Sequence, residues 1–278
     1  MSVLRVPARG PFHHTAALAM LAAHAIPGAE VLDGTAYRRA LAIDGEPVLV
    51  TVVPDPQGVT VTTDRAVGDG GATAALIRRW FDLDTDTDAI ERTLAGDQFL
   101  APLVERRPGL RIVGYPDEFE AVAATVIGQQ VSLAAARTFA GRLVAAHGNP
   151  IGDLRTFPDA ARLARLGVEE IQRCVGLTRA RARTLHEVSR RWADGPLLHG
   201  LPVADARRLL LDIPGIGPWT ADYLLVRALR HPDTFAPGDL VARRALGLDQ
   251  AAAAARARAW APYRSYALVH LWTEAAYL

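Results

Sequence analysis

Apolar residues recur along the first part of the chain at two different spacings. Over residues 12–25 they return every three or four positions, which predicts an amphipathic helix. The runs 37–43, 47–53 and 59–63 are apolar and rich in β-branched residues, so they predict three strands. Short turns, such as the one at Asp44, separate the runs and predict an antiparallel meander.

From residue 72 onward the apolar spacing is helical, and no strand is expected after Asp82. The alternating aspartates that begin there lack the Gly and Glu of a calcium loop, because Thr87 and Thr93 stand at those positions. We therefore expect the solvated start of a capped helix. Further helices are expected near residues 72–81, 88–94, 97–106, 117–127, 132–146, 159–166, 169–175, 179–192, 203–211, 219–229, 240–246, 251–260 and 263–277.

These elements predict an α+β fold. A small antiparallel-sheet lobe is expected over residues 1–88, and a mainly α-helical body of two lobes follows it. The first helical lobe is expected over residues 89–230, and C-terminal helices over 231–278 complete the second.

One stretch breaks the helical spacing in an informative way. Residues 209–225 read Leu-Leu-Leu-Asp-Ile-Pro-Gly-Ile-Gly-Pro-Trp-Thr-Ala-Asp-Tyr-Leu-Leu. Pro214 and Gly215 end one helix, and we expect Gly217 to adopt backbone angles that a side chain would forbid. A second helix resumes at Trp219. Its unpaired first-turn amides and its dipole predict a phosphate-binding hairpin, although an ordinary helix–helix turn is the alternative.

The hairpin and its surroundings resemble a known family. Ile-Pro-Gly-Ile-Gly-x-x-Thr-Ala at 213–221, with Pro-Gly-Asp at 237–239, is similar to the helix-hairpin-helix (HhH-GPD) superfamily of DNA glycosylases. The Trp-Thr-Ala-x-Tyr variant at 219–223 and the tail 263–272 resemble its 3-methyladenine DNA glycosylase II (AlkA) family. The resemblance runs from about Pro11 to Trp272. It implies a monofunctional enzyme of base excision repair that flips alkylated purines, such as 3-methyladenine and 7-methylguanine, out of double-stranded DNA and hydrolyses the N-glycosidic bond.

Asp239 is the candidate catalytic residue. It follows Pro-Gly and precedes a predicted helix, so its structural interpretation is an N-cap. A helix N-terminus also favours a carboxylate. The resemblance implies that this aspartate is catalytic, because a carboxylate can stabilise the positive charge that develops on the sugar or activate the attacking water.

The chain contains no lysine, since all 31 basic residues are arginine. Bifunctional members of the superfamily attack the sugar with a lysine in the second helix of the hairpin, and Trp219 stands at that position here. The resemblance therefore implies hydrolysis without lyase activity. The N-terminal amine is the one remaining primary amine.

Aromatic residues form the candidate base pocket. Trp219 and Tyr223 lie four positions apart, on one helical face, where they could equally be core residues. The resemblance implies that they line an electron-rich pocket with Trp272, and a cationic base over such rings gains about 0.5–2 kcal/mol. Met20 and Val241 take the other pocket positions. A well-known relative has Phe and Leu there, so this pocket is expected to be roomier or less aromatic.

The resemblance also assigns residues to DNA. Gln129 and Gln130 follow a helix break, where a polar connecting loop is the structural interpretation. The family uses this loop as a minor-groove wedge that fills the gap left by the flipped base. Gln130 stands at the wedge position, where a well-known relative has Leu. The expected DNA-contacting residues are Gly215, Gly217, Thr220, Gln129 and Gln130.

Composition adds further expectations. Residues 1–88 hold seven arginines against eleven acidic residues and the remainder 24 against 19, so the basic excess lies with the hairpin, as DNA contact requires. A single cysteine excludes an internal disulfide and a four-cysteine iron–sulfur cluster. We expect a cytoplasmic, nucleoid-associated monomer without a membrane segment.

The eight scattered histidines indicate no metal site. The one ion that the resemblance allows is a monovalent cation held by backbone carbonyls of the hairpin. Two other functions fit parts of the pattern. One is a non-catalytic protein that binds DNA structure through the hairpin. The other is a glycosylase for neutral lesions such as hypoxanthine or ethenoadenine.

Overall fold

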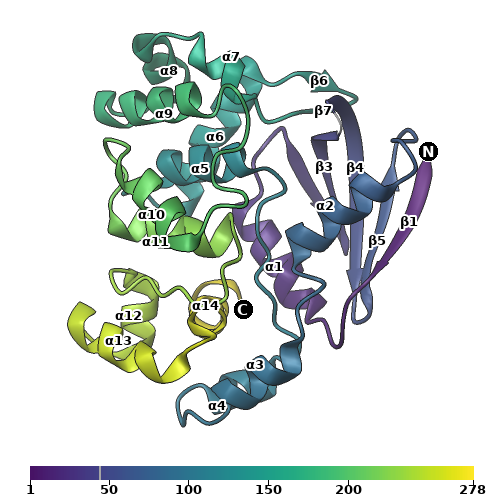
Figure 1. The fold of residues 1–278 in the computed structure, drawn as a ribbon. Helices are drawn as coiled ribbons and strands as arrows, with labels where there is room; N and C mark the ends of the chain where they lie inside the picture. Colours follow the sequence, from purple (N-terminus) through teal and green to yellow (C-terminus); the bar gives the residue numbers. More distant parts are fainter. Residues whose placement is uncertain (44) are drawn as a thin grey trace.

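The computed structural model describes residues 1–43 and 45–278, so the predicted turn at Asp44 lies outside the described residues. An N-terminal lobe with a β-sheet lies beside a helical body (Figure 1). The expected α+β fold class, with its small antiparallel sheet and two-lobe helical body, is confirmed.

The sheet has five antiparallel strands in the order β1-β5-β4-β3-β2. The three predicted strands form its centre, but the two edge strands were missed. The edge strands expose most of their side chains, so their sequences lack the apolar alternation on which the prediction depended. The strands are β1 (Ser2–Pro7), β2 (Glu30–Asp33), β3 (Ala36–Ile43), β4 (Glu46–Asp55) and β5 (Gly58–Thr63).

Two helices pack against this sheet. α1 (His14–His24) contacts β4, and α2 (Gly71–Phe81) contacts β1. The inward side chains of β4 and the ring of Trp80 are almost fully buried in the resulting core. The N-terminal lobe therefore has an apolar core of its own.

The first helical lobe holds the hairpin. Its core is formed by side chains of α5 to α11, and the hairpin joins α10 to α11. The helices are α5 (Glu118–Gly128), α6 (Leu133–His147), α7 (Ala160–Ala164), α8 (Val168–Val175), α9 (Arg179–Arg191), α10 (Val203–Leu211) and α11 (Pro218–Arg227). Between α6 and α7 lies a two-stranded ribbon, β6 (Pro150–Ile151) and β7 (Leu154–Arg155), so the expectation of no strand after Asp82 was wrong.

The second helical lobe combines two distant segments. Side chains of α3 and α4 pack with those of the C-terminal helices, although the sequence grouped residues 90–112 with the first helical lobe. The reason is that the buried residues of α3 and α4, such as Ile90 and Leu94, meet Trp260 and Tyr266. The helices are α3 (Thr87–Leu94), α4 (Ala101–Arg106), α12 (Leu240–Leu246), α13 (Gln250–Arg256), η1 (Ala257–Trp260), α14 (Arg264–Trp272) and η2 (Thr273–Tyr277).

Asp82 is part of this packing rather than of a solvated helix start. The Tyr266 hydroxyl donates to its Oδ2 at 2.7 Å, and burial raises the pKa of the Asp82 carboxyl. The expectation holds for Asp86, which caps α3 by accepting the amide of Asp88. Within the described residues, we find no helix with the length and apolarity that a bilayer crossing requires.

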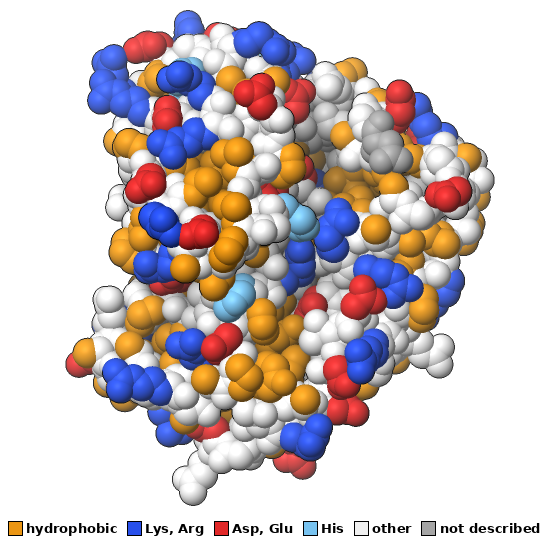
Figure 2. All heavy atoms as spheres, viewed as in Figure 1, with side chains coloured by type: hydrophobic (Ala, Val, Ile, Leu, Met, Phe, Trp, Pro, Cys, Tyr) orange, Lys and Arg blue, Asp and Glu red, His pale blue; other side chains and the backbone are white. Residues whose placement is uncertain are grey.

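A groove of about 780 Å³ separates the N-terminal lobe from the helical body, and Figure 2 shows the surface hollowed there. Its walls include Leu41 from β3, Arg79 from α2 and Trp192 at the end of α9. None of the predicted site residues lines this groove.

Candidate active site

Asp239 caps α12. Its backbone is extended, with φ −67° and ψ 120°, and its Oδ1 accepts the amide of Ala242 at 2.8 Å. The side chain is buried, and only 5% of the residue is exposed. The N-cap interpretation is confirmed, and the catalytic role stays a prediction.

Two indole groups complete the surroundings of this carboxylate. Nε1 of Trp219 donates to Oδ2 of Asp239 at 2.8 Å, and Nε1 of Trp272 donates to Oδ1 at 3.1 Å. Three N–H donors from three elements therefore fix both oxygens. The sequence predicted these tryptophans as ring surfaces only and did not predict their hydrogen bonds to Asp239.

The predicted aromatic residues form one stack. The rings of Trp219 and Tyr223 are stacked, with centroids 5.3 Å apart and planes at 28°. The Tyr223 ring also lies 5.5 Å from that of Trp272. Trp272 is buried, whereas Trp219, Tyr223 and Val241 are half-buried at the edge of the same apolar cluster. This stack leaves partly exposed ring surface beside Asp239.

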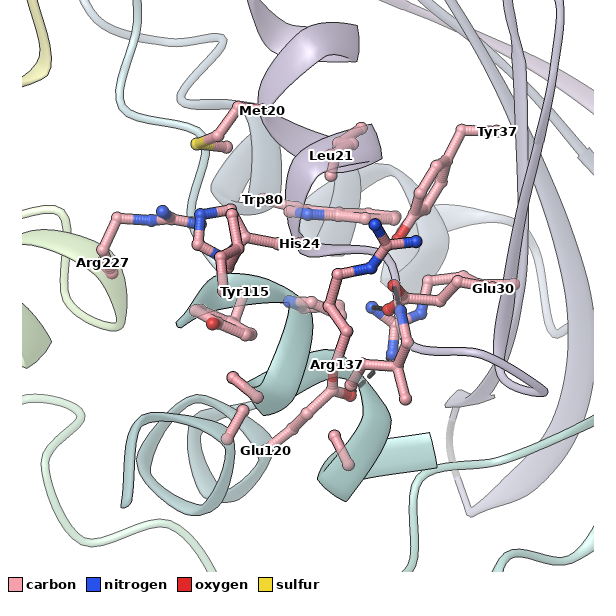
Figure 3. A pocket seen from close by; sticks show the side chains of 18 residues that line it. Met20, Leu21, His24, Glu30, Tyr37, Trp80, Tyr115, Glu120, Arg137 and Arg227 are labelled. Atoms are coloured by element: carbon pink, nitrogen blue, oxygen red, sulfur yellow. Dashed lines mark hydrogen bonds and ion pairs between the residues drawn. The ribbon is translucent and has the colours of Figure 1, made fainter. Parts of the chain in front are cut away.

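Met20 lies apart from this stack. It belongs to the buried face of α1, which packs on β4, and it is a member of the N-terminal core. Its side chain lines a separate cavity of about 60 Å³ together with His24, Tyr115 and Arg227 (Figure 3). Met20 thus belongs to a different apolar cluster from the other four predicted pocket residues, and its place in a base pocket stays a prediction.

The two hairpin glycines differ in what they require. Gly215 has φ +94°, and a Cβ there would lie 2.0 Å from Oγ1 of Thr184, which donates to the Pro214 carbonyl at 2.9 Å. Gly217 has φ −95° and ψ 176°, an extended conformation open to any residue, and a Cβ would meet no protein atom within 4 Å. The expectation that Gly217 needs angles forbidden to a side chain was therefore wrong, and it applies to Gly215 instead.

The hairpin leads directly into α11. Gly217 is the N-cap and supplies no side chain to the first-turn amides, and Pro218 follows as the first helical residue. This arrangement leaves the first-turn amides without a capping side chain, as a phosphate seat requires. Phosphate binding at Gly215 and Gly217 stays a prediction.

The loop after α5 is tied to the hairpin. Nε2 of Gln129 donates to the Gly215 carbonyl at 3.0 Å and to Oγ1 of Thr220 at 3.1 Å. Thr220 is buried and its hydroxyl accepts from Gln129, so the contact of Thr220 with DNA stays a prediction. Gln130 comes next with φ +56°, a strained conformation for a residue with a side chain.

Loop, hairpin and aromatic stack share one surface. A depression of about 500 Å³ is lined by Gln129, Gln130, residues 215–217, Trp219 and Thr220. Two further residues that the sequence analysis missed shape it. Arg181 donates to the Ile127 and Gln129 carbonyls at 3.2 and 3.1 Å, and Thr184 braces the hairpin. A single polar residue on a helix, such as Arg181 or Thr184, does not indicate in the sequence that it bonds to a distant loop.

Arg227 was also missed, although its spacing offered a signal. Positions 219, 223 and 227 share one face of α11, and the Arg227 guanidinium lies 5.8 Å from the centroid of the Tyr223 ring. Among the described residues, no group of three or more His, Cys, Asp and Glu side chains could hold a metal ion.

Two family models match the chain. Residues 3–117 match the AlkA N-terminal domain, and residues 123–258 match the HhH-GPD superfamily base excision DNA repair protein. DNA-3-methyladenine glycosylase 2 of Escherichia coli is 31% identical, over 94% of each chain. A solved 3-methyladenine DNA-glycosylase from Archaeoglobus fulgidus superposes with a TM-score of 0.84 at 23% identity and covers 99% of both chains.

Another relative is longer than this chain. The probable bifunctional transcriptional activator/DNA repair enzyme AlkA of Mycobacterium tuberculosis is 38% identical over 97% of this chain, which spans 56% of that relative. This chain thus spans little more than half the length of that curated relative.

Proposed function

This chain belongs to the HhH-GPD superfamily of base excision DNA repair proteins, in its AlkA branch, and we propose that it is a DNA glycosylase that excises alkylated purines from duplex DNA. The substrate class comes from relatives whose names give 3-methyladenine as the base removed. The protein would act as a monomer on chromosomal DNA in the cytoplasm.

The observation that carries this proposal is the setting of Asp239. Its carboxylate is buried and accepts three N–H donors. Two of these donors are the indoles of Trp219 and Trp272, which are predicted to line the base pocket. A structural helix cap needs only the Ala242 amide. A non-catalytic DNA-binding hairpin would need neither indole donor.

The arrangement supports the following reaction. The hairpin amides bind a phosphate, the Gln129–Gln130 loop enters the minor groove, and the extruded base stacks beside Trp219 and Tyr223. As the N-glycosidic bond breaks, the fixed carboxylate of Asp239 stabilises the positive charge on the sugar. Water then adds to the sugar, and an intact abasic strand remains. A monovalent cation at the hairpin carbonyls would assist phosphate binding.

The absence of lysine makes the proposed reaction monofunctional. An enzyme without a lysine side chain has no ε-amine to form a Schiff base with the sugar. We therefore expect base release without strand cleavage by the protein.

A release assay tests this proposal. Duplex DNA containing 7-methylguanine is incubated with the protein, and free base and abasic sites are measured. We expect equal amounts of both, no strand break before alkali treatment, and no covalent adduct with borohydride. Binding without base release would support the non-catalytic alternative, and a trapped peptide carrying an imine would overturn the monofunctional reaction.

A further inference from the structure

Arg227 is a buried charge without an acidic partner. Only 2% of the residue is exposed, and its Nε has no hydrogen-bond partner. No carboxylate in residues 1–43 and 45–278 forms an ion pair with it. Arg39, buried to the same extent, pairs with Glu30 at 2.8 Å and Glu120 at 2.6 Å. Burial of an unpaired guanidinium is unfavourable, so its retention needs a reason.

Aromatic rings take the place of the missing carboxylate. The guanidinium carbon lies 5.2 Å from the centroid of the Tyr115 ring and 5.8 Å from that of Tyr223, and Nη1 lies 3.4 Å from the Tyr223 hydroxyl. In Figure 3 the guanidinium points toward His24, with Tyr115 beside it. The Tyr277 hydroxyl lies 3.0 Å from Nε2 of His24, within hydrogen-bond distance.

We call the side chains around the guanidinium, Tyr115, Tyr223, Tyr277 and His24, the Arg227 cage. Apart from the guanidinium, this cage is neutral. Burial, with the nearby charges of Arg227 and Arg137, lowers the pKa of His24 to about 3, so the imidazole is uncharged at neutral pH. Burial raises the pKa values of Tyr115 and Tyr277, so these hydroxyls stay protonated. Arginine does not lose its proton in proteins. The positive charge of Arg227 is therefore fixed, and the two carboxylates that line the same cavity, Glu30 and Glu120, pair with Arg39 instead.

The charge lies behind the aromatic stack of the active site. Tyr223 lies between Trp219 and Arg227 along α11: its ring stacks on Trp219, which donates to Asp239, and its centroid is 5.8 Å from the Arg227 guanidinium. We propose that Arg227 determines lesion selectivity, because its charge behind Tyr223 opposes cationic bases and narrows the advantage that the aromatic rings give them over neutral bases. This inference rests on the proposed function, since it needs the extruded base to stack on these rings.

The distance is short enough for such an effect. A base stacked against Tyr223 or Trp219 would lie roughly 10–15 Å from the guanidinium, where two unit charges at an effective dielectric constant of about 20 change a rate roughly 6- to 16-fold before salt screens them. A neutral base feels only the weaker interaction of the charge with its dipole. Removal of the charge should therefore raise the rate for a cationic base relative to a neutral one.

The test compares release of 7-methylguanine, which is cationic, with release of hypoxanthine, which is neutral. Both are measured from the same duplex sequence as kcat/KM, and each is normalised to its uncatalysed depurination. Arg227→Met removes the charge and keeps the length of the side chain. His24→Glu neutralises the charge in a second way: it keeps Arg227 and places a carboxylate beside the guanidinium.

We expect both neutralising variants to raise the normalised ratio of 7-methylguanine to hypoxanthine release about 3- to 10-fold. Arg227→Lys, which keeps the charge, should leave the ratio within about twofold of wild type. Arg137→Met is the matched control: Arg137 lines the same cavity, but its Nε donates to the Ala25 carbonyl. Its ratio should also stay at the wild-type value.

An unchanged ratio in Arg227→Met and His24→Glu would overturn the inference and leave Arg227 with a packing role. If Arg227→Met does not fold, His24→Glu alone decides. The proposed function fails separately, through absence of base release by the wild-type protein, whereas failure of the inference leaves that release intact.

Discussion

Asp239 has both carboxylate oxygens bound before any substrate arrives. The same residues that hold it are the ones expected to hold the base: Trp219 and Trp272 each donate an N–H to the carboxylate, and their rings are the predicted pocket surface. A substitution at either tryptophan therefore changes the position of Asp239 as well as the ring surface. The cleanest test of the carboxylate is at Asp239 itself.

We predict that Asp239→Asn lowers base excision by about 10²–10⁴-fold with the fold retained. Asparagine is a good N-cap, so its oxygen can still accept the Ala242 amide. Its NH₂ group would then face the indole N–H of Trp219, and the negative charge is lost. Excision is measured by base release and folding by the thermal unfolding midpoint.

Asp249→Asn is the matched control. Asp249 caps α13 by accepting the Ala252 amide at 2.8 Å, so the same substitution is made at a helix cap outside the site. Its excision rate should equal that of wild type. Wild-type turnover in folded Asp239→Asn would remove Asp239 from the mechanism.

At the scale of elements, the hairpin contains one glycine that its backbone conformation requires, Gly215, and one that is expected to face DNA, Gly217. Gly215→Ala is predicted to destabilise the protein by about 1–2 kcal/mol, because alanine is strained at positive φ and its Cβ displaces Thr184. Gly217→Val should change stability by less than about 1 kcal/mol. It should weaken binding of damaged and undamaged duplex alike, since the new side chain occupies the space for phosphate.

Gly167→Val is the matched control for this pair. Gly167 is also an N-cap without a side-chain bond, at φ −76° and ψ 156°, but it precedes α8. It should have the same small effect on stability and none on DNA binding, measured by chemical denaturation and fluorescence anisotropy. A binding loss in Gly217→Val confined to damaged DNA would show that the hairpin recognises the lesion and not the backbone.

The loop that carries Gln130 allows a test of wedge action. We predict that Gln130→Ala lowers excision roughly tenfold when the lesion lies opposite its normal partner, because extrusion then costs a few kcal/mol that a wedge partly offsets. The loss should shrink when the opposite nucleotide is abasic, since the base is already unpaired. Equal losses on both duplexes would assign Gln130 to general DNA affinity.

Elements with strong local signals could be predicted from the sequence. The helices that begin near residues 117 and 132, the N-cap at Asp239 and the hairpin could be read from adjacent residues, and the structure has helices at each. The edge strands β1 and β2 could not be predicted, because their mostly exposed side chains carry no apolar period. The ribbon could not be predicted because each of its strands has only two residues, too few to show a period. Local signals also failed at Gly217, where the glycine pattern did not reveal which position has positive φ.

At the scale of the whole molecule, contacts between distant segments could not be predicted from the sequence. Asp239 was identified from its motif, but its bonds to Trp219 and Trp272 join positions 20 and 33 residues away. The packing of α3 and α4 against the C-terminal helices, and the cage around Arg227, depend likewise on segments that meet only in the fold. Spacing along one helix cannot show which distant segment covers it.

The N-terminal lobe is joined to the helical body by a buried charge cluster. Arg39 of β3 pairs with Glu30 of β2 and with Glu120 of α5, and each of the three residues is less than 10% exposed. One guanidinium cannot compensate two carboxylates fully. Burial raises the pKa of Glu120 to about 7 against the attraction of Arg39, and the Glu30 carboxylate contributes in the same direction.

This cluster makes stability depend on pH. Between the ordinary carboxyl pKa and about 7, the folded protein holds a proton on Glu120 that the unfolded chain has released, so this group favours the folded state less as pH rises. The buried histidines His24 and His270, whose pKa values are lowered to about 3, act in the opposite direction below their ordinary pKa. A comparison of variants is therefore needed to isolate Glu120.

We predict that Glu120→Gln gains stability relative to wild type as pH rises from 5 to 8, by up to about 3 kcal/mol. Glutamine keeps the hydrogen bond to Arg39 and cannot ionise, and both proteins share every other titrating group, so the histidine contribution cancels in the difference. Chemical denaturation at each pH gives the two free energies of unfolding. Glu105→Gln, on the exposed surface of α4, is the control and should show a constant difference. A constant difference for Glu120→Gln as well would mean that Glu120 stays ionised in the folded protein, with Arg39 able to hold both carboxylates as anions between the lobes.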